Sequence, residues 1–72
     1  MVNKIIDTAR AHREDVYRRA EYVFGDREKA QLWLNSPIKS LGGQVPEQLL
    51  DSDEGIERVL HVLGLIEWGV YS

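Results

Sequence analysis

The sequence predicts an all-α protein, a small bundle of four to five helices with a long C-terminal helix. Apolar residues recur at three- and four-residue spacing, and no stretch shows the strict alternation of a half-buried strand. Helix-ending residues are followed by capping residues at several points, which divides the chain into short helical units. The 72 residues form one domain at most, and a domain of this size buries only about 60% of its unfolded surface. Self-association or a permanent partner is therefore expected to add stability.

The first predicted helix begins with a cap at Asn3 and ends at Phe24. One face of it carries Ile6, Ala9, Val16, Ala20, Val23 and Phe24, with Tyr17 at the edge. Arg13 falls inside this apolar stripe, so we expect the helix to project beyond the small core and Arg13 to lie past its rim. Gly25 suits the left-handed residue that ends a helix.

A shorter helix is predicted over residues 27–35, with Asp26 as its cap. Ala30, Trp33 and Leu34 face inward on this helix, and we expect Trp33 to anchor the core instead of stacking on a ligand. The helix stops at Ser36 because Pro37 disfavours helical geometry in the residue before it.

Residues 38–43 are predicted to form a short turn, in which Gly42 and Gly43 supply backbone angles that other residues resist. Pro46 suits the first position of a one-turn helix over residues 46–50. The two glycines do not indicate a phosphate-binding loop, because the lysine and the preceding strand of such a loop are absent.

The last helix is predicted over residues 53–71, with Ser52 or Asp53 as its cap. Its core face consists of Ile56, Val59, Leu60, Leu63, Ile66 and Val70. A second apolar surface on the opposite side consists of Val62, Leu65 and Trp68, beside Gly69. Because the chain is short, it cannot easily cover both apolar faces of this helix. We therefore expect the second surface to contact a partner. Glu67 interrupts the core face, and its carboxylate should form a local hydrogen bond or reach solvent at the helix end.

The net charge of −3 is unevenly distributed along the chain. Residues 1–30 hold seven Lys/Arg against six Asp/Glu, whereas residues 31–72 hold two against six. An acidic C-terminal half repels a phosphate backbone, so we do not expect that half to bind nucleic acid. It would suit a partner with a basic cleft, such as one built for an anionic substrate.

The residues that could carry catalysis are scattered, so we expect no enzyme activity and no cofactor. The chain has no cysteine, and two distant histidines, His12 and His61, make a poor metal site. His61 lies one turn after Glu57, as in a solvated charge pair on a helix. There is no secretory signal, and no apolar run approaches the roughly 20 residues that a membrane span needs. These features favour a cytoplasmic protein.

Three segments in this order resemble a known family. They cover residues 20–34, residues 41–50, and residues 55–63 with 66–70. Together they resemble the toxin-binding domain of Xre/MbcA/ParS-type antitoxins, over residues 16–72, which leaves residues 1–15 as an N-terminal helix extension. The residues that mark the resemblance most clearly are Gly25, Asp26, Trp33, Leu41, Gly42, Gly43 and Pro46.

The resemblance implies an antitoxin that neutralises a RES-domain toxin encoded beside it. Toxins of this class degrade NAD or use it for ADP-ribosylation, and the C-terminal region of the antitoxin obstructs the active-site entrance. On this chain the contact would involve Trp68, Gly69, Val70, Tyr71 and Ser72. An NAD cleft is expected to hold basic groups for the pyrophosphate, which would suit the acidic C-terminal half.

Two departures from the family pattern leave alternatives open. Many relatives carry an N-terminal helix-turn-helix domain, whereas residues 1–15 can hold only part of one helix. Glu47 stands where an apolar residue is expected after the proline, so the short helix should be more exposed than usual. The alternative functions are a DNA-binding autoregulator, acting through the mixed-charge first helix, and a homo-oligomeric helical protein without an enzyme partner.

Overall fold

The computed structural model describes residues 8–69, with side chains from Arg13 onward. It contains four α-helices and one short 3-10 helix: α2 (Thr8–Phe24), α3 (Arg27–Leu34), η1 (Lys39–Leu41), α4 (Pro46–Leu49) and α5 (Asp53–Glu67). The prediction of an all-α fold is confirmed. The described residues form no strand and only one isolated β-bridge, between Ile38 and Gln44. The predicted cap at Asn3 and the apolar Ile6 lie outside the described residues.

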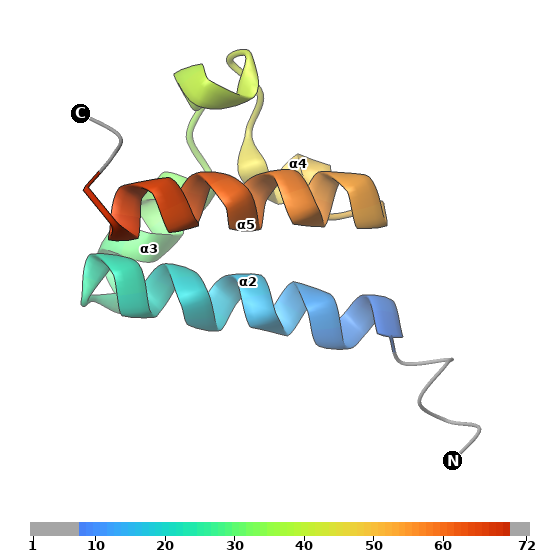
Figure 1. Ribbon diagram of the computed structural model, residues 1–72, viewed down its shortest axis with the longest axis horizontal. Coiled ribbons are helices and arrows are strands. Elements are labelled where there is room, and N and C mark those ends of the chain that lie inside the picture. The colour runs from blue at the N-terminus through green and yellow to red at the C-terminus, as the bar shows by residue number, and fades with distance from the viewer. Residues whose placement is uncertain (1–7, 70–72) are drawn as a thin grey trace.

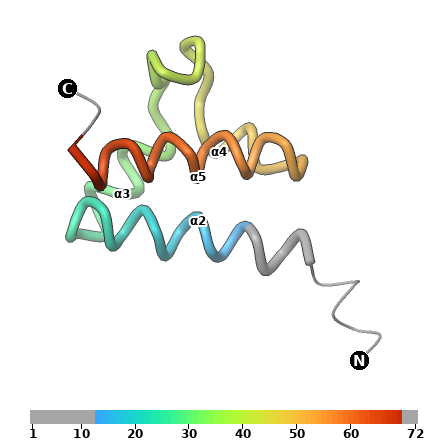
Figure 2. Tube along the Cα trace, in the orientation of Figure 1, coloured from blue at the N-terminus to red at the C-terminus, as the bar shows by residue number. Residues whose placement is uncertain are grey.

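The two long helices, α2 and α5, lie side by side and run in the same direction (Figure 1). Between them the chain returns through α3, η1 and α4 from the C-terminal end of α2 to the N-terminal end of α5 (Figure 2). Side chains from all of these segments meet in one core. Its buried apolar members are Val16, Ala20, Ala30, Leu34, Ile38, Leu41, Leu50, Ile56, Val59, Val62 and Leu63.

The capping residues fix the helix boundaries near the predicted places. The Asp26 carboxylate accepts a hydrogen bond of 2.9 Å from the backbone N–H of Lys29, so it caps α3. Ser52, not Asp53, caps α5, because its Oγ accepts a 3.0 Å hydrogen bond from the Gly55 N–H. Gly25 has a φ of 69° and ends α2 in the left-handed conformation, as predicted.

The loop between α3 and α4 is more ordered than the predicted simple turn. Gly42 and Gly43 have φ angles of 69° and 82°, which only glycine adopts at little cost. The N–H of Ile38 donates to Gln44 O at 3.0 Å, which closes the base of the loop. Leu41 is 1% exposed and anchors the loop in the core, where a fully buried leucine contributes roughly 2 kcal/mol. Pro46 is buried at the first position of α4, as predicted.

The predicted end of the last helix at residue 71 is wrong, since α5 ends at Glu67. Gly69 has a φ of 72°, and its N–H donates to Ile66 O at 3.1 Å in place of continuing the helix. Glycine in this position is a common way to end a helix. Val70, assigned to the core face of the predicted helix, lies outside the described residues.

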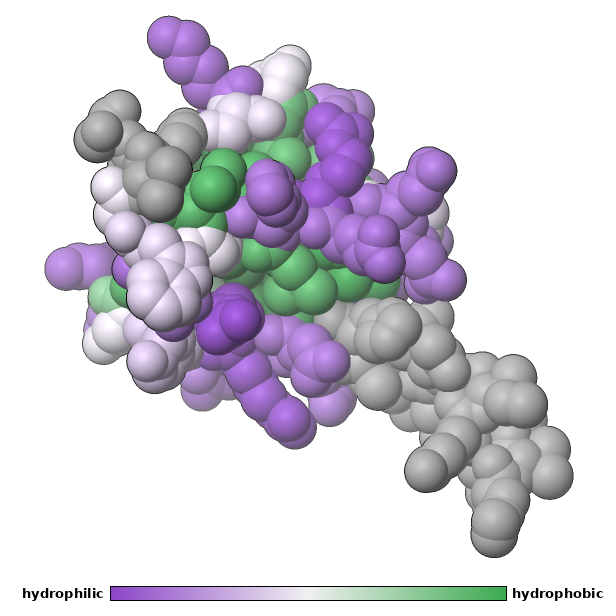
Figure 3. All heavy atoms as spheres, in the orientation of Figure 1, coloured by the Kyte–Doolittle hydropathy of each residue, from purple (hydrophilic) through white to green (hydrophobic). Residues whose placement is uncertain are grey.

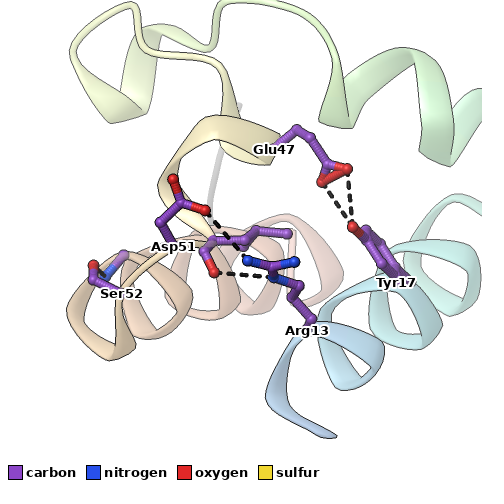
Figure 4. Close-up of polar contacts among 7 residues, drawn as sticks. Arg13, Tyr17, Glu47, Asp51 and Ser52 are labelled. Carbon is purple, nitrogen blue, oxygen red and sulfur yellow. Dashed lines mark hydrogen bonds and ion pairs between the residues drawn. The ribbon is translucent and has the colours of Figure 1, made fainter. Parts of the chain in front are cut away.

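Two polar contacts join α2 to the region of α4 (Figure 4). The guanidinium of Arg13 donates from Nε to the carbonyl of Leu50 at 3.2 Å and pairs with the Asp51 carboxylate at 3.2 Å. The last carbonyls of a helix lack partners within it, so Arg13 satisfies one of them at the end of α4. Tyr17 donates its hydroxyl to the Glu47 carboxylate, 2.9 Å from each oxygen. The bond to Tyr17 explains how position 47 can hold a glutamate, although the family pattern suggested an apolar residue there.

The contact between Tyr17 and Glu47 predicts a loss of stability at high pH. Burial raises the pKa of Tyr17, and the hydrogen bond to Glu47 and its negative charge raise it further. The folded state therefore favours the neutral phenol, and the resulting stability is complete below the ordinary tyrosine pKa of about 10. This stability is lost as the pH rises through the pKa that Tyr17 has in the folded state, which is above its ordinary pKa. Urea unfolding between pH 8 and 12 should show this decline, and it should be smaller in a Tyr17→Phe variant.

At pH 8 the Tyr17→Phe variant should itself lose about 1 kcal/mol, because Glu47 loses its donor. Tyr22→Phe is the matched control, since the Tyr22 side chain is 69% exposed, and it should unfold like the wild-type chain at pH 8. Equal pH dependence in the Tyr17→Phe variant and the wild-type chain would contradict the assigned role of this contact.

A third polar contact joins the C-terminal ends of α2 and α5. Glu67 was expected to form a local hydrogen bond or to reach solvent, but its carboxylate pairs with Arg19 on α2 at 3.3 Å. The Glu67 side chain is 22% exposed and that of Arg19 49%, so neither charge is fully removed from water. The pair allows a glutamate on the core-facing side of α5 without leaving a buried charge unpaired.

Candidate functional site

The exposed side of α5 is narrower than the sequence predicts. Val62, expected on the free second surface, is only 4% exposed, so that expectation is wrong. The cause is the packing of η1 against this side of α5, which places Val62 in the same core cluster as Leu41. Helical periodicity placed Val62 opposite the core face, but it could not reveal that a loop far along the chain covers that side. A polar substitution at Val62 would therefore disrupt the fold and could not report on a surface.

The C-terminal end of α5 does present apolar surface. Trp68 is the C-cap residue of the helix, and its side chain is 78% exposed. Leu65, one turn earlier, is half-buried. Gly69 follows in the left-handed conformation, which ends the helix. An exposed tryptophan is a side chain that contributes strongly to affinity when a partner buries it, so the role predicted for Trp68 stays a prediction.

Apolar surface is also exposed along the seam between α2 and α5, where charged side chains surround it (Figure 3). Leu60 is half-buried there, in a shallow groove lined on the α2 side by Asp15, Arg18, Arg19 and Tyr22. Tyr22 of α2 and Leu32 of α3 are the other strongly exposed large apolar residues among residues 13–69, at 69% and 71%. The sequence reading did not single out these two residues, although helical periodicity places both on outward faces.

In the described chain, the residues that mark the family resemblance pack in the core, cap a helix or adopt left-handed backbone angles. Trp33 packs against the core, and its ring centroid lies 5.7 Å from that of Phe24 at an interplanar angle of 43°. Asp26 caps a helix, Leu41 and Pro46 are buried, and the glycines adopt positive φ angles. The predicted contact residues Val70, Tyr71 and Ser72 lie outside the described residues, so their role stays a prediction.

The described residues show neither a cluster of metal-binding side chains nor a helix that could cross a membrane. Over residues 8–69, no group of three or more His, Cys, Asp or Glu side chains could hold a metal ion. His61 lies exposed on α5, beside a groove that it shares with Glu54, Glu57 and Arg58. Within the same residues, no helix is long and apolar enough to cross a membrane.

Comparison with known proteins identifies a family that covers most of the chain. Residues 19–69 match the family described as the antitoxin Xre/MbcA/ParS C-terminal toxin-binding domain. Two curated relatives, both called Antitoxin Xre, come from Photorhabdus laumondii and Yersinia enterocolitica. Each is 42% identical over 48 residues, which are 67% of this chain and 32% of the relative, so the matched segment spans about a third of their length. No solved structure matches this chain.

The matched residues extend from the middle of α2 to the left-handed Gly69, and so include every helix from α3 to α5. They contain the exposed Trp68 and the loop of Gly42 and Gly43. Because the match covers most of the chain and follows the order of its structural elements, the resemblance seen in the sequence is confirmed. This chain belongs to the Xre/MbcA/ParS antitoxin family, through the toxin-binding domain that forms the C-terminal part of such antitoxins.

Proposed function

We propose that this chain binds and inhibits a RES-domain, NAD-consuming toxin, and that it does so by covering the entrance of the toxin's active site. The observation that carries the proposal is the match of residues 19–69 to a toxin-binding domain, together with the exposed Trp68 near the end of the matched segment. The chain itself acts as a non-catalytic inhibitor. Its contact with the toxin is formed by Leu65, Trp68 and Gly69 and continues through Val70, Tyr71 and Ser72.

The charge distribution supports an enzyme partner that handles an anionic substrate. Residues 31–72 hold six Asp/Glu against two Lys/Arg. A cleft that binds the pyrophosphate of NAD needs basic groups, and an acidic inhibitor complements such a cleft. Charge complementarity of this kind mainly accelerates association and selects the correct partner.

The ion pairs of α2 favour a protein partner over DNA. Arg13 pairs with Asp51, Arg18 with Glu14 at 3.7 Å, and Arg19 with Glu67. Arginines that already face carboxylates leave little net positive charge for a phosphate backbone, which is the main source of DNA affinity. We therefore expect the chain alone to give no gel shift on its own promoter at physiological salt.

Co-expression with the product of the neighbouring gene tests the proposed function. The toxin alone should arrest growth and deplete NAD, and co-expression of this chain should restore both growth and the NAD level. The two proteins should also co-purify. Continued growth arrest with both proteins present, or the absence of a complex, would refute the proposal. Restored growth without any change in NAD would retain the antitoxin role but refute the NAD-consuming chemistry.

A further inference from the structure

A groove separates η1 from the outward side of α5. It has a volume of about 640 Å³, and Ser40 and Leu41 line one side of it. The α5 side is lined by Glu54, Glu57, Arg58, His61 and Val62. Leu41 and Val62 are almost fully buried and form an apolar floor, whereas the charged residues are exposed along the rim.

The wall formed by η1 is held by hydrogen bonds within its own loop. The N–H groups of Leu41 and Gly43 both donate to the carbonyl of Ile38 at 2.9 Å, and the bridge between Ile38 and Gln44 closes the loop. Leu41 is fixed in the core at the same time. A preformed wall loses little conformational entropy on binding, so contacts made there contribute more of their energy to affinity.

The carboxylates on the rim of the groove make no ion pair with other described residues. The ion pairs of the described residues occupy Glu14, Glu21, Asp51 and Glu67. Glu54 and Glu57 make no ion pair among residues 13–69, and the i,i+3 spacing places them as neighbours on one helix face. Two such carboxylates can flank one guanidinium or ammonium group. Among the described residues that line the groove, Glu54 and Glu57 face a single arginine, Arg58, so carboxylates outnumber guanidinium groups on the rim.

The groove faces the same way as the exposed end of α5. At 100° per residue, Glu54, Arg58, His61, Leu65 and Trp68 fall within about a quarter of the helix circumference. A toxin that buries Trp68 and continues along this stripe reaches the rim of the groove. The apolar contact and the charged groove are parts of one continuous face.

We propose that this groove receives a basic segment of the toxin, with a lysine or arginine side chain placed between Glu54 and Glu57 over the apolar floor. The inference rests on the proposed function, because the toxin is the partner that supplies the segment. The proposal assigns two roles along α5. Burial of Trp68 holds the complex together, and the negative rim of the groove attracts and orients the toxin as it binds.

Association kinetics of the chain with its toxin, measured at several salt concentrations, test the assignment. The double variant Glu54→Gln/Glu57→Gln should associate about tenfold more slowly at low salt and show a weaker salt dependence, because charged rims act mainly on the on-rate. Glu57→Gln alone should show part of this effect. It also avoids the loss of a carboxylate from the first turn of α5, where Glu54 complements the helix dipole.

Glu28→Gln is the matched control, because Glu28 is an exposed carboxylate in the first turn of α3, away from the groove. It should associate like the wild-type chain, and thermal melting should show that all variants are folded. If the wild-type chain binds the toxin and the double variant binds with the same rate and salt dependence, the groove assignment is wrong while the antitoxin function stands. If the wild-type chain does not bind the toxin at all, the proposed function itself fails.

Discussion

A Gly55→Ala substitution is expected to destabilise the chain by about 3 kcal/mol, a large part of the stability of so small a domain. Gly55 is buried in the first turn of α5, and a Cβ added there would lie directly on the backbone carbonyl of Leu49. Backbone cannot move aside as a flexible side chain can. The substitution would therefore separate α4 from α5 and disturb the cap in which the Gly55 N–H donates to Ser52.

Gly64→Ala is the matched control for this prediction. Gly64 lies within the same helix, but a Cβ there meets nothing within 4 Å. Alanine has the higher helix propensity, so this variant should be more stable than the wild-type chain by up to about 1 kcal/mol. Circular dichroism melting of both variants is sufficient, because a loss of 3 kcal/mol lowers the Tm of so small a domain by roughly 12 °C or more. Equal melting temperatures for the two variants would show that α4 and α5 are not in close contact at Gly55.

Gly55 also illustrates how much the sequence can predict. Helix boundaries follow from local chemistry, so the caps at Asp26 and Ser52 and the left-handed Gly25 could be identified from their own segments. The requirement for glycine at position 55 depends on a contact with α4, and its φ angle is ordinary. Such contacts between segments leave no periodic signal in the sequence.

The same limit explains the error at Val62. Periodicity gives the direction of a side chain around α5, but not which other segment lies there. The loop at η1 covers Val62 because its own hydrogen bonds hold Leu41 inward. Trp68, in contrast, extends past the end of that covering segment and remains exposed as expected. The ion pair of Arg19 and Glu67 is a further contact between helices that no local pattern predicts.

Trp68→Ala is expected to weaken the complex with the toxin by about 2 kcal/mol or more, a roughly 30-fold increase in Kd. Indole rings that become fully buried in an interface are among the side chains that contribute most to affinity. The isolated domain should be hardly affected, because the side chain is 78% exposed and the cap of α5 is made by backbone groups of Trp68 and Gly69. Its stability should change by less than about 0.5 kcal/mol.

Leu32→Ala provides the control, since it removes a similarly exposed apolar side chain, 71% exposed, from α3 instead of α5. Calorimetric titration of each variant with the toxin gives the Kd, and urea unfolding gives the stability of the free chain. If Leu32→Ala raises the Kd strongly and Trp68→Ala does not, the toxin contact lies on α3 and not on α5. If both variants bind as the wild-type chain does, the seam between α2 and α5 around Leu60 becomes the surface to test, because it is the remaining apolar surface identified in the described part of the chain.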